Sequence, residues 1–132
     1  MKNIQRISMF SILVLSALII FGGCKKEAED PTPTFTISYD SVSIVGGGKG
    51  LQFFAVCTNN GVKMTNVTLL TPSSGQYIYD FGGASYNKDA RFGLQGTNSA
   101  YTKFLGTWKI KLTGSSSGGT AFTHDANVVV TN

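Results

Sequence analysis

Apolar and polar residues alternate with a period of two over much of the chain beyond residue 34, which is the pattern of strands with one buried face. The clearest case is Gly106–Thr113, where Trp108 and two aliphatic residues point to one side and threonines and lysines to the other. Gly114–Gly119 predicts a turn, after which Phe122–Val130 again carries apolar residues at alternate positions. These two segments are expected to form a hairpin.

A second hairpin is expected around Asn60-Gly61, because this dipeptide favours a turn in which both central residues have positive φ. It would join Leu51–Thr58 to Val62–Thr71. Shorter strands are expected at Phe35–Tyr39, Ser41–Val45, Gln76–Phe81 and Arg91–Gln95. Seven or eight short strands separated by turn residues predict an all-β fold, an antiparallel sandwich of two sheets.

The run Gly-Thr-Trp-Lys-Ile-Lys-Leu-Thr-Gly at residues 106–114 is followed by a polar turn and a final strand rich in valine. This ending resembles the last two strands of bacterial immunoglobulin-like domains, which implies an immunoglobulin-like arrangement of the two sheets. The disulfide that bridges the sheets of antibody domains is absent, because Cys57 has no second cysteine in this region. Such an architecture does not specify a function.

A different apolar segment precedes the strands. Ile7–Phe21 is almost wholly apolar, follows a short start with two cations, and stops at Gly22-Gly23-Cys24. As a helix its 15 residues would span about 22 Å, less than the hydrocarbon core of about 30 Å. The segment is therefore typical of an export signal. The alternative is a membrane-spanning helix followed by an ordinary cysteine.

Two small residues directly before Cys24 are what a peptidase cutting in front of the cysteine requires. This arrangement resembles the lipobox of bacterial lipoproteins, with Phe21 in place of the leucine usually found three residues before the cysteine. The resemblance implies that residues 1–23 are removed as a signal peptide. It also implies that Cys24 carries lipid and anchors the protein in the outer membrane, so that membrane lipid is its first partner.

Residues 24–34 contain no large apolar side chain, so we expect a solvated, disordered tether. Its composition resembles the surface-export signal of lipoproteins from the Bacteroidota, which implies display on the outer surface of the cell. The alternative is a spacer that holds the domain at the periplasmic face of a membrane. The folded domain is expected over residues 35–132. The residues of the export signal would be Lys25, Lys26, Glu27, Glu29 and Asp30.

The expected domain carries seven basic residues and four aspartates, spread along its length, and no glutamate. The basic residues do not cluster, so nucleic acid is not expected as a partner. The mild positive charge could equally favour an acidic polysaccharide or no partner at all. The expected partner class is a protein or a polysaccharide of the cell envelope.

No recognised catalytic or metal-binding motif is present. Cys57 lies in an apolar strand and is expected to be a buried free thiol. His124, the only histidine, is expected to be partly packed at a sheet edge, on the same face as Phe122 and Ala126. The dispersed aspartates provide neither the carboxylate pair of a glycosidase nor the convergent ligands of a metal site. We therefore expect no enzyme, no cofactor and no metal.

Four tyrosines are the candidates for a binding surface. Tyr77 and Tyr79 share one face of their strand, whereas Tyr86 and Tyr101 are expected in loops beside amide side chains. If these rings were exposed, they could stack on sugar rings. The alternative is that Tyr77, Tyr79 and Phe81 form an inward row that fills the core.

Asp40-Ser41-Val42 is expected at a turn between two strands. It resembles the acceptor for O-linked glycans on exported proteins of the Bacteroidota, which implies glycosylation of Ser41. Taken together, the sequence predicts a membrane-anchored, non-catalytic lipoprotein that presents a β-sandwich as an interaction or structural module at the cell envelope. The alternative function is a glycan-binding accessory module that uses exposed loop aromatics.

Overall fold

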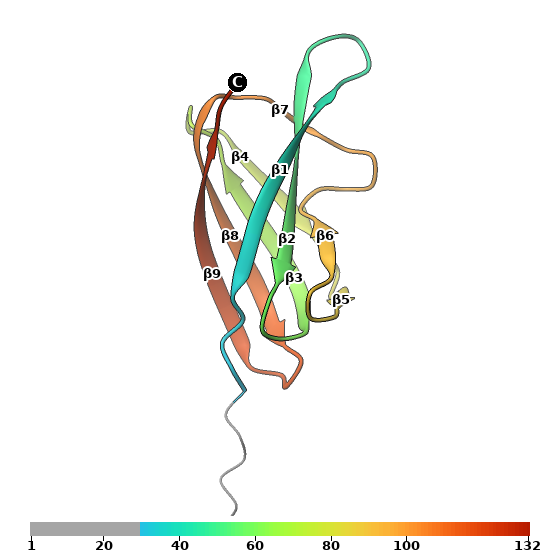
Figure 1. Ribbon diagram of the computed structural model, residues 1–132, viewed down its shortest axis with the longest axis vertical. Coiled ribbons are helices and arrows are strands. Elements are labelled where there is room, and N and C mark those ends of the chain that lie inside the picture. Colours follow the sequence, from blue (N-terminus) through green and yellow to red (C-terminus); the bar gives the residue numbers. More distant parts are fainter. Residues whose placement is uncertain (1–29) are drawn as a thin grey trace, which may run out of the picture.

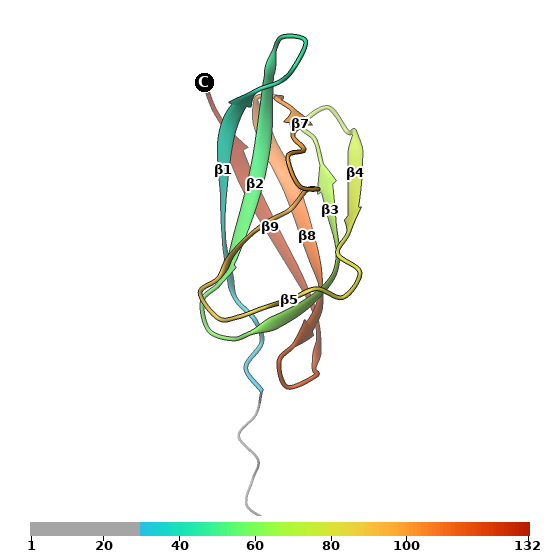
Figure 2. The same ribbon diagram turned by 90° about the vertical axis from the view of Figure 1, so that its right-hand side faces the viewer.

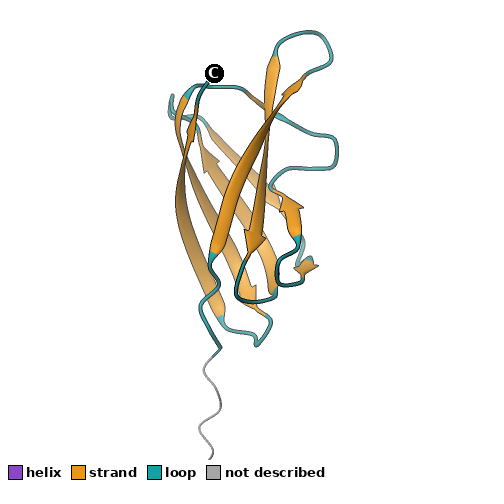
Figure 3. Cartoon of the chain, in the orientation of Figure 1, coloured by secondary structure: helices purple, strands orange, loops and turns teal. Residues whose placement is uncertain are grey.

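The computed structural model of the protein describes residues 30–132. The described residues contain strands and loops but no helix (Figure 3). The expected signal peptide, Cys24 and the export-signal residues before Asp30 lie outside the described residues. Nine strands are present, β1 Phe35–Ser43, β2 Lys49–Cys57, β3 Val62–Leu70, β4 Gln76–Asp80, β5 Ser85–Tyr86, β6 Arg91–Gly93, β7 Tyr101–Thr102, β8 Gly106–Ser116 and β9 Ala121–Val130.

The strands form two antiparallel sheets packed face to face (Figure 1). One sheet has the order β1-β2-β6 with β7 also beside β2, and the other has the order β4-β3-β8-β9 with β5 also beside β3. In Figure 2, β1 and β2 lie on the left and β3 and β4 on the right. The chain thus alternates between the sheets in the immunoglobulin-like manner, and the predicted two-sheet sandwich is confirmed.

The core lies between the sheets and is centred on β2, β3 and β8. The expected hairpin of the last two strands is confirmed, since β8 and β9 pair along their length and Trp108 is fully buried. The fully or almost fully buried apolar residues are Leu51, Phe53, Ala55, Cys57, Val62, Met64, Val67, Leu69, Phe92, Leu94, Trp108, Ile110, Leu112, Phe122 and Val130.

The hairpin expected at Asn60-Gly61 is wrong. β2 pairs with β1, β6 and β7, whereas β3 pairs with β4, β5 and β8, so residues 58–61 carry the chain from one sheet to the other. Neither Asn60 nor Gly61 is among the described residues with positive φ. The physical reason is burial: inward residues such as Phe53 and Met64 are covered only when β2 and β3 face each other across the core.

The two strands expected at residues 35–39 and 41–45 are one strand, β1. Its pairing with β2 runs without a break from Phe35 opposite Cys57 to Ser43 opposite Lys49. Ser41 therefore lies within a strand rather than at a turn, although its side chain is exposed. The turn comes later, at three glycines whose φ angles of +96°, +97° and +103° require residues without a Cβ, residues 46–48.

The last residues of the expected tether, Asp30 to Thr34, lie against the domain. Pro33 is buried, and the backbone N–H of Thr34 donates to Oδ1 of Asn59 at 3.0 Å. The amide of Asn59 in turn donates to the carbonyl oxygen of Thr32 at 3.0 Å. A polar segment can order in this way because the loop that joins the two sheets offers amide partners. The folded unit therefore begins before Phe35.

Candidate functional site

The four candidate tyrosines gather on one side of the sandwich, where β4 faces β6 and β7. The Tyr77 ring lies 4.8 Å from the Tyr101 ring and 6.4 Å from Trp108, measured between ring centroids. Tyr79 meets Phe81 at 4.9 Å. All four tyrosines are half-buried and pack against the core. Tyr77, Tyr79 and Phe81 thus form the inward row that the sequence left as an alternative.

Tyr86 and Tyr101 lie in short strands, β5 and β7, rather than in the expected loops. The Tyr86 ring stacks on Phe92 at 4.1 Å with an interplanar angle of 14°, and its burial raises its pKa, with Tyr79 adding to the effect. The Tyr101 hydroxyl donates to the carbonyl oxygen of Leu94 at 2.7 Å. Because these tyrosine rings pack against neighbouring aromatic rings, their arrangement does not favour a flat, exposed platform for sugar stacking.

Tyr101 gives the domain a distinctive response to alkaline pH. Burial raises the pKa of Tyr101 to about 12, with smaller contributions from Tyr79 and Tyr77. An unfolded tyrosine ionises near pH 10. Between these values the unfolded chain loses this proton while the folded chain keeps it, so the free energy of unfolding falls as the pH rises.

We expect Tyr101→Phe to remove part of this alkaline fall. It should also lower the free energy of unfolding at neutral pH by about 0.5–1.5 kcal/mol, because the hydrogen bond to Leu94 is lost. Urea unfolding at several pH values between about 8 and 12 measures both effects. Tyr39→Phe is the control, since a hydrogen bond from the Thr131 backbone lowers the pKa of Tyr39. If the free energy of unfolding fell equally with rising pH in the parent and in Tyr101→Phe, the expectation would be contradicted.

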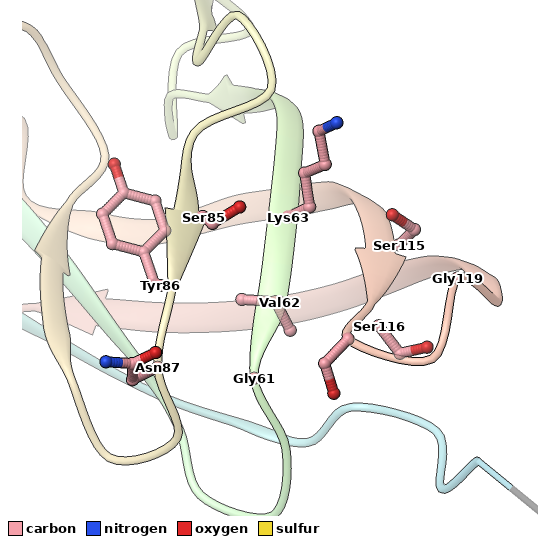
Figure 4. Close-up of a pocket in the computed structure, with 10 residues that line it drawn as sticks. Gly61, Val62, Lys63, Ser85, Tyr86, Asn87, Ser115, Ser116 and Gly119 are labelled. Atoms are coloured by element: carbon pink, nitrogen blue, oxygen red, sulfur yellow. The ribbon is translucent and has the colours of Figure 1, made fainter.

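A groove of about 460 Å³ lies beside the first residues of β3 and the last residues of β8 (Figure 4). Lys63, Ser85 and Ser115 extend into this region from three neighbouring strands, and the Tyr86 ring lies on the other side of β5 from Lys63. An ammonium group, hydroxyls and an amide can hydrogen-bond to a polar molecule. The residues lining the groove include no carboxylate, thiol or imidazole for acid–base or nucleophilic chemistry.

The two residues best suited to chemistry are packed in the fold. Cys57 is a free cysteine with 0 % exposure, which confirms the expected buried thiol. His124 is half-buried on β9, with its ring 5.1 Å from that of Phe35, which confirms a partly packed position at a sheet edge. Among residues 30–132, no three histidine, cysteine, aspartate or glutamate side chains lie close enough to hold a metal ion. No helix in this part of the chain is long and apolar enough to span a membrane.

Asp30 has a structural role that sequence reasoning missed by grouping it with the export signal. Its carboxylate accepts hydrogen bonds from the hydroxyl of Ser116 and, at 2.9 Å, from the amide of Asn60. The Ser117 hydroxyl donates to Oδ1 of Asn60 at 2.6 Å. These four residues, which we call the Asp30 clasp, fix the incoming chain at one end of the sandwich. The available signal was the pair of consecutive amides Asn59-Asn60. They lie just after a buried strand, and their side chains can hydrogen-bond to a neighbouring segment.

The two ends of the sandwich differ. The chain enters at the clasp end, and the tip of the β1–β2 hairpin and the last described residues lie at the opposite, far end (Figure 1). Apolar side chains are exposed at or near the far end, where β3 and β9 end and β8 begins. These side chains are Ile44, Val45, Leu70, Phe104, Leu105 and Val129, with Ile78 exposed on β4.

Comparison with protein-family models, curated proteins and solved structures finds no match for this chain.

Proposed function

We propose that this chain is a lipid-anchored, non-catalytic lipoprotein that presents its β-sandwich as an interaction or structural module at the cell envelope, on the outer surface of the outer membrane. The observation that carries the proposal is the apolar segment that stops at Gly22-Gly23-Cys24, followed within a few residues by a folded domain. Lipid on Cys24 would hold the protein in the membrane and leave the sandwich outside it.

The position of the clasp supports a short attachment. Only six residue steps separate Cys24 from Asp30. Even a fully extended chain of this length reaches at most about 22 Å. The clasp end would therefore stay within this distance of the lipidated residue, so the domain would remain close to the membrane surface.

An interaction role is supported by the far end of the sandwich. Val45 is fully exposed, Val129 is 62 % exposed and Leu105 is 50 % exposed. Exposed apolar side chains at this end give it surface that a partner could cover. A protein or a polysaccharide of the envelope is the proposed partner class. A non-catalytic role is supported by the complete burial of Cys57, which withdraws its thiol from chemistry.

Cys24→Ala is expected to move the protein from the membrane fraction to the soluble fraction, because a variant without the thiol cannot carry the lipid. Membrane fractionation followed by immunodetection measures the distribution. Ser41→Ala, which changes an exposed residue of β1, is the matched control and should remain with the membrane. A Cys24→Ala variant that still sediments with the membrane would show that the anchor lies elsewhere.

Surface display is tested by protease treatment of intact cells. The proposal expects the sandwich to be digested or released. A joint change of Lys25, Lys26, Glu27 and Glu29 to alanine should then protect it from the protease by retaining it inside. Asp30 is left unchanged in this variant because it belongs to the clasp. Protection of the parent protein from external protease would instead favour the periplasmic face.

A further inference from the structure

The free edges on the two sides of the sandwich differ in length. On one side the edge strands are short, with five residues in β4, three in β6 and two in β7. On the other side they are long, with nine residues in β1 and ten in β9. Short edge strands are a common protection against pairing with another chain, whereas a long edge offers a row of unpaired backbone groups.

β9 lacks most of the usual protections of an exposed edge, and Asp125 is its one acidic residue. Its pairing with β8 runs from Ala121 opposite Ser115 to Val130 opposite Gly106 without a register shift, so no bulge twists the strand away. The strand contains no proline, lysine or arginine. Within the described residues it pairs with β8 alone, and it forms the left border of the ribbon in Figure 1.

The inward face of β9 is also incompletely covered. His124, Ala126 and Val128 point inward but remain half-exposed. In the neighbouring strand β8, the inward residues Trp108 and Leu112 are completely buried. An additional strand beside β9 would extend the sheet and cover these side chains.

We propose that β9 pairs with β9 of a second copy of this chain, antiparallel and around a twofold axis at Ala126. The pairing would join two four-stranded runs, β4-β3-β8-β9, into one continuous sheet. It does not depend on the lipid anchor.

The register follows from faces and charges. Inward residues must oppose inward residues, because a shift by one position would turn core side chains to solvent. Among the twofold registers that allow this, those centred on Asp125 and on Ala126 align most of the strand. The first places two Asp125 carboxylates opposite each other, which is unfavourable. The second places Asp125 opposite Asn127 of the other copy and His124 opposite Val128, without a pair of like charges.

The dimer is compatible with a membrane anchor on each copy. In antiparallel pairing, Phe122 of one copy lies opposite Val130 of the other, so the two clasp ends point in opposite directions. The eight residue steps between the two Phe122 positions correspond to about 27 Å along the sheet. Both short tethers reach one membrane if the dimer lies along its surface.

Cysteine cross-linking in membranes containing the full chain tests the register. Ala126→Cys should give a covalent dimer with a mild oxidant or a short bismaleimide, because residue 126 faces its own copy. Thr123→Cys is the control, since its two copies would lie about 20 Å apart along the strands. The parent chain controls for Cys24 and the buried Cys57. A failure of Ala126→Cys to cross-link, or its cross-linking to a different protein, would overturn the proposal.

Two substitutions of opposite charge at Asn127 provide a second readout in the detergent-purified full chain. Asn127→Asp places like charges opposite each other twice around the axis, so the dimer dissociation constant should rise roughly two- to thirtyfold. Asn127→Lys places opposite charges there and should keep or tighten the dimer. Light scattering over a range of protein concentrations measures both. A monomeric parent, or equal dissociation constants for the two variants, would contradict β9 pairing whatever the result of Cys24→Ala fractionation.

Discussion

Replacement of Trp108 by alanine is expected to lower the free energy of unfolding by about 3–5 kcal/mol. Trp108 has 0 % exposure and lies 5.0 Å from the Phe53 ring, measured between centroids. Its indole N–H donates to the carbonyl oxygen of Phe104 at 2.9 Å. Alanine would therefore leave both a large cavity and an unpaired carbonyl. For a domain of this size such a loss is a large part of the usual stability of about 5–15 kcal/mol.

Urea unfolding monitored by circular dichroism measures this loss without relying on the removed fluorophore. Trp108→Phe should cost less, because a ring is retained and only the hydrogen bond and part of the volume are lost. Ile78→Ala is the surface control, since Ile78 is 65 % exposed on β4 and should change the free energy by no more than about 0.5 kcal/mol. A similar small change for Trp108→Ala would show that Trp108 is not central to the core.

Gly114→Ala is expected to destabilise the domain by about 3 kcal/mol, at the upper end of the usual cost of overpacking. A Cβ at position 114 would lie 2.3 Å from the carbonyl oxygen of Lys63. This atom belongs to the backbone of β3, which pairs with β8 across a register shift between Met64 and Asn66. The clash can be relieved only by moving the two strands apart at this irregularity.

Gly61→Ala is the matched control for Gly114→Ala. A Cβ at position 61 would meet its nearest atom, the Cβ of Ser117, at 3.4 Å, which is an ordinary contact. The two variants add the same methyl group, so the difference in their urea midpoints reports the local packing alone. Equal midpoints for the two variants would contradict the close approach of β3 and β8.

The period-two pattern was sufficient for the last hairpin because β8 and β9 are adjacent in sequence and in the sheet. In β8, one face lies in the core and the other in water, so the polarity of each side chain predicts the face on which it lies. The same pattern is interrupted in β3, where Met64 and Val67 are both buried although three positions apart. The register shift between them restores the inward direction, and a local pattern does not predict such a shift.

The preference of Asn60-Gly61 for a tight turn did not decide whether β2 and β3 pair in one sheet. Turn preferences are local, whereas the choice between pairing β2 with β3 and packing them face to face depends on which arrangement buries both strands. For the same reason composition placed Asp30 in a tether, although its partners Asn60 and Ser116 are distant in sequence. For the candidate tyrosines, the sequence left both a surface and a core position open. Their packing against the core, such as Tyr86 on Phe92, distinguishes the two positions.

The anchor at Cys24 is tested most directly by mass spectrometry of the N-terminal peptide of the protein purified from membranes. The proposed function predicts a peptide that begins at Cys24 and carries the mass of a diacylglyceryl group on its sulfur. A peptide in which residues before Cys24 are still attached, or one in which Cys24 has an unmodified thiol, would contradict it.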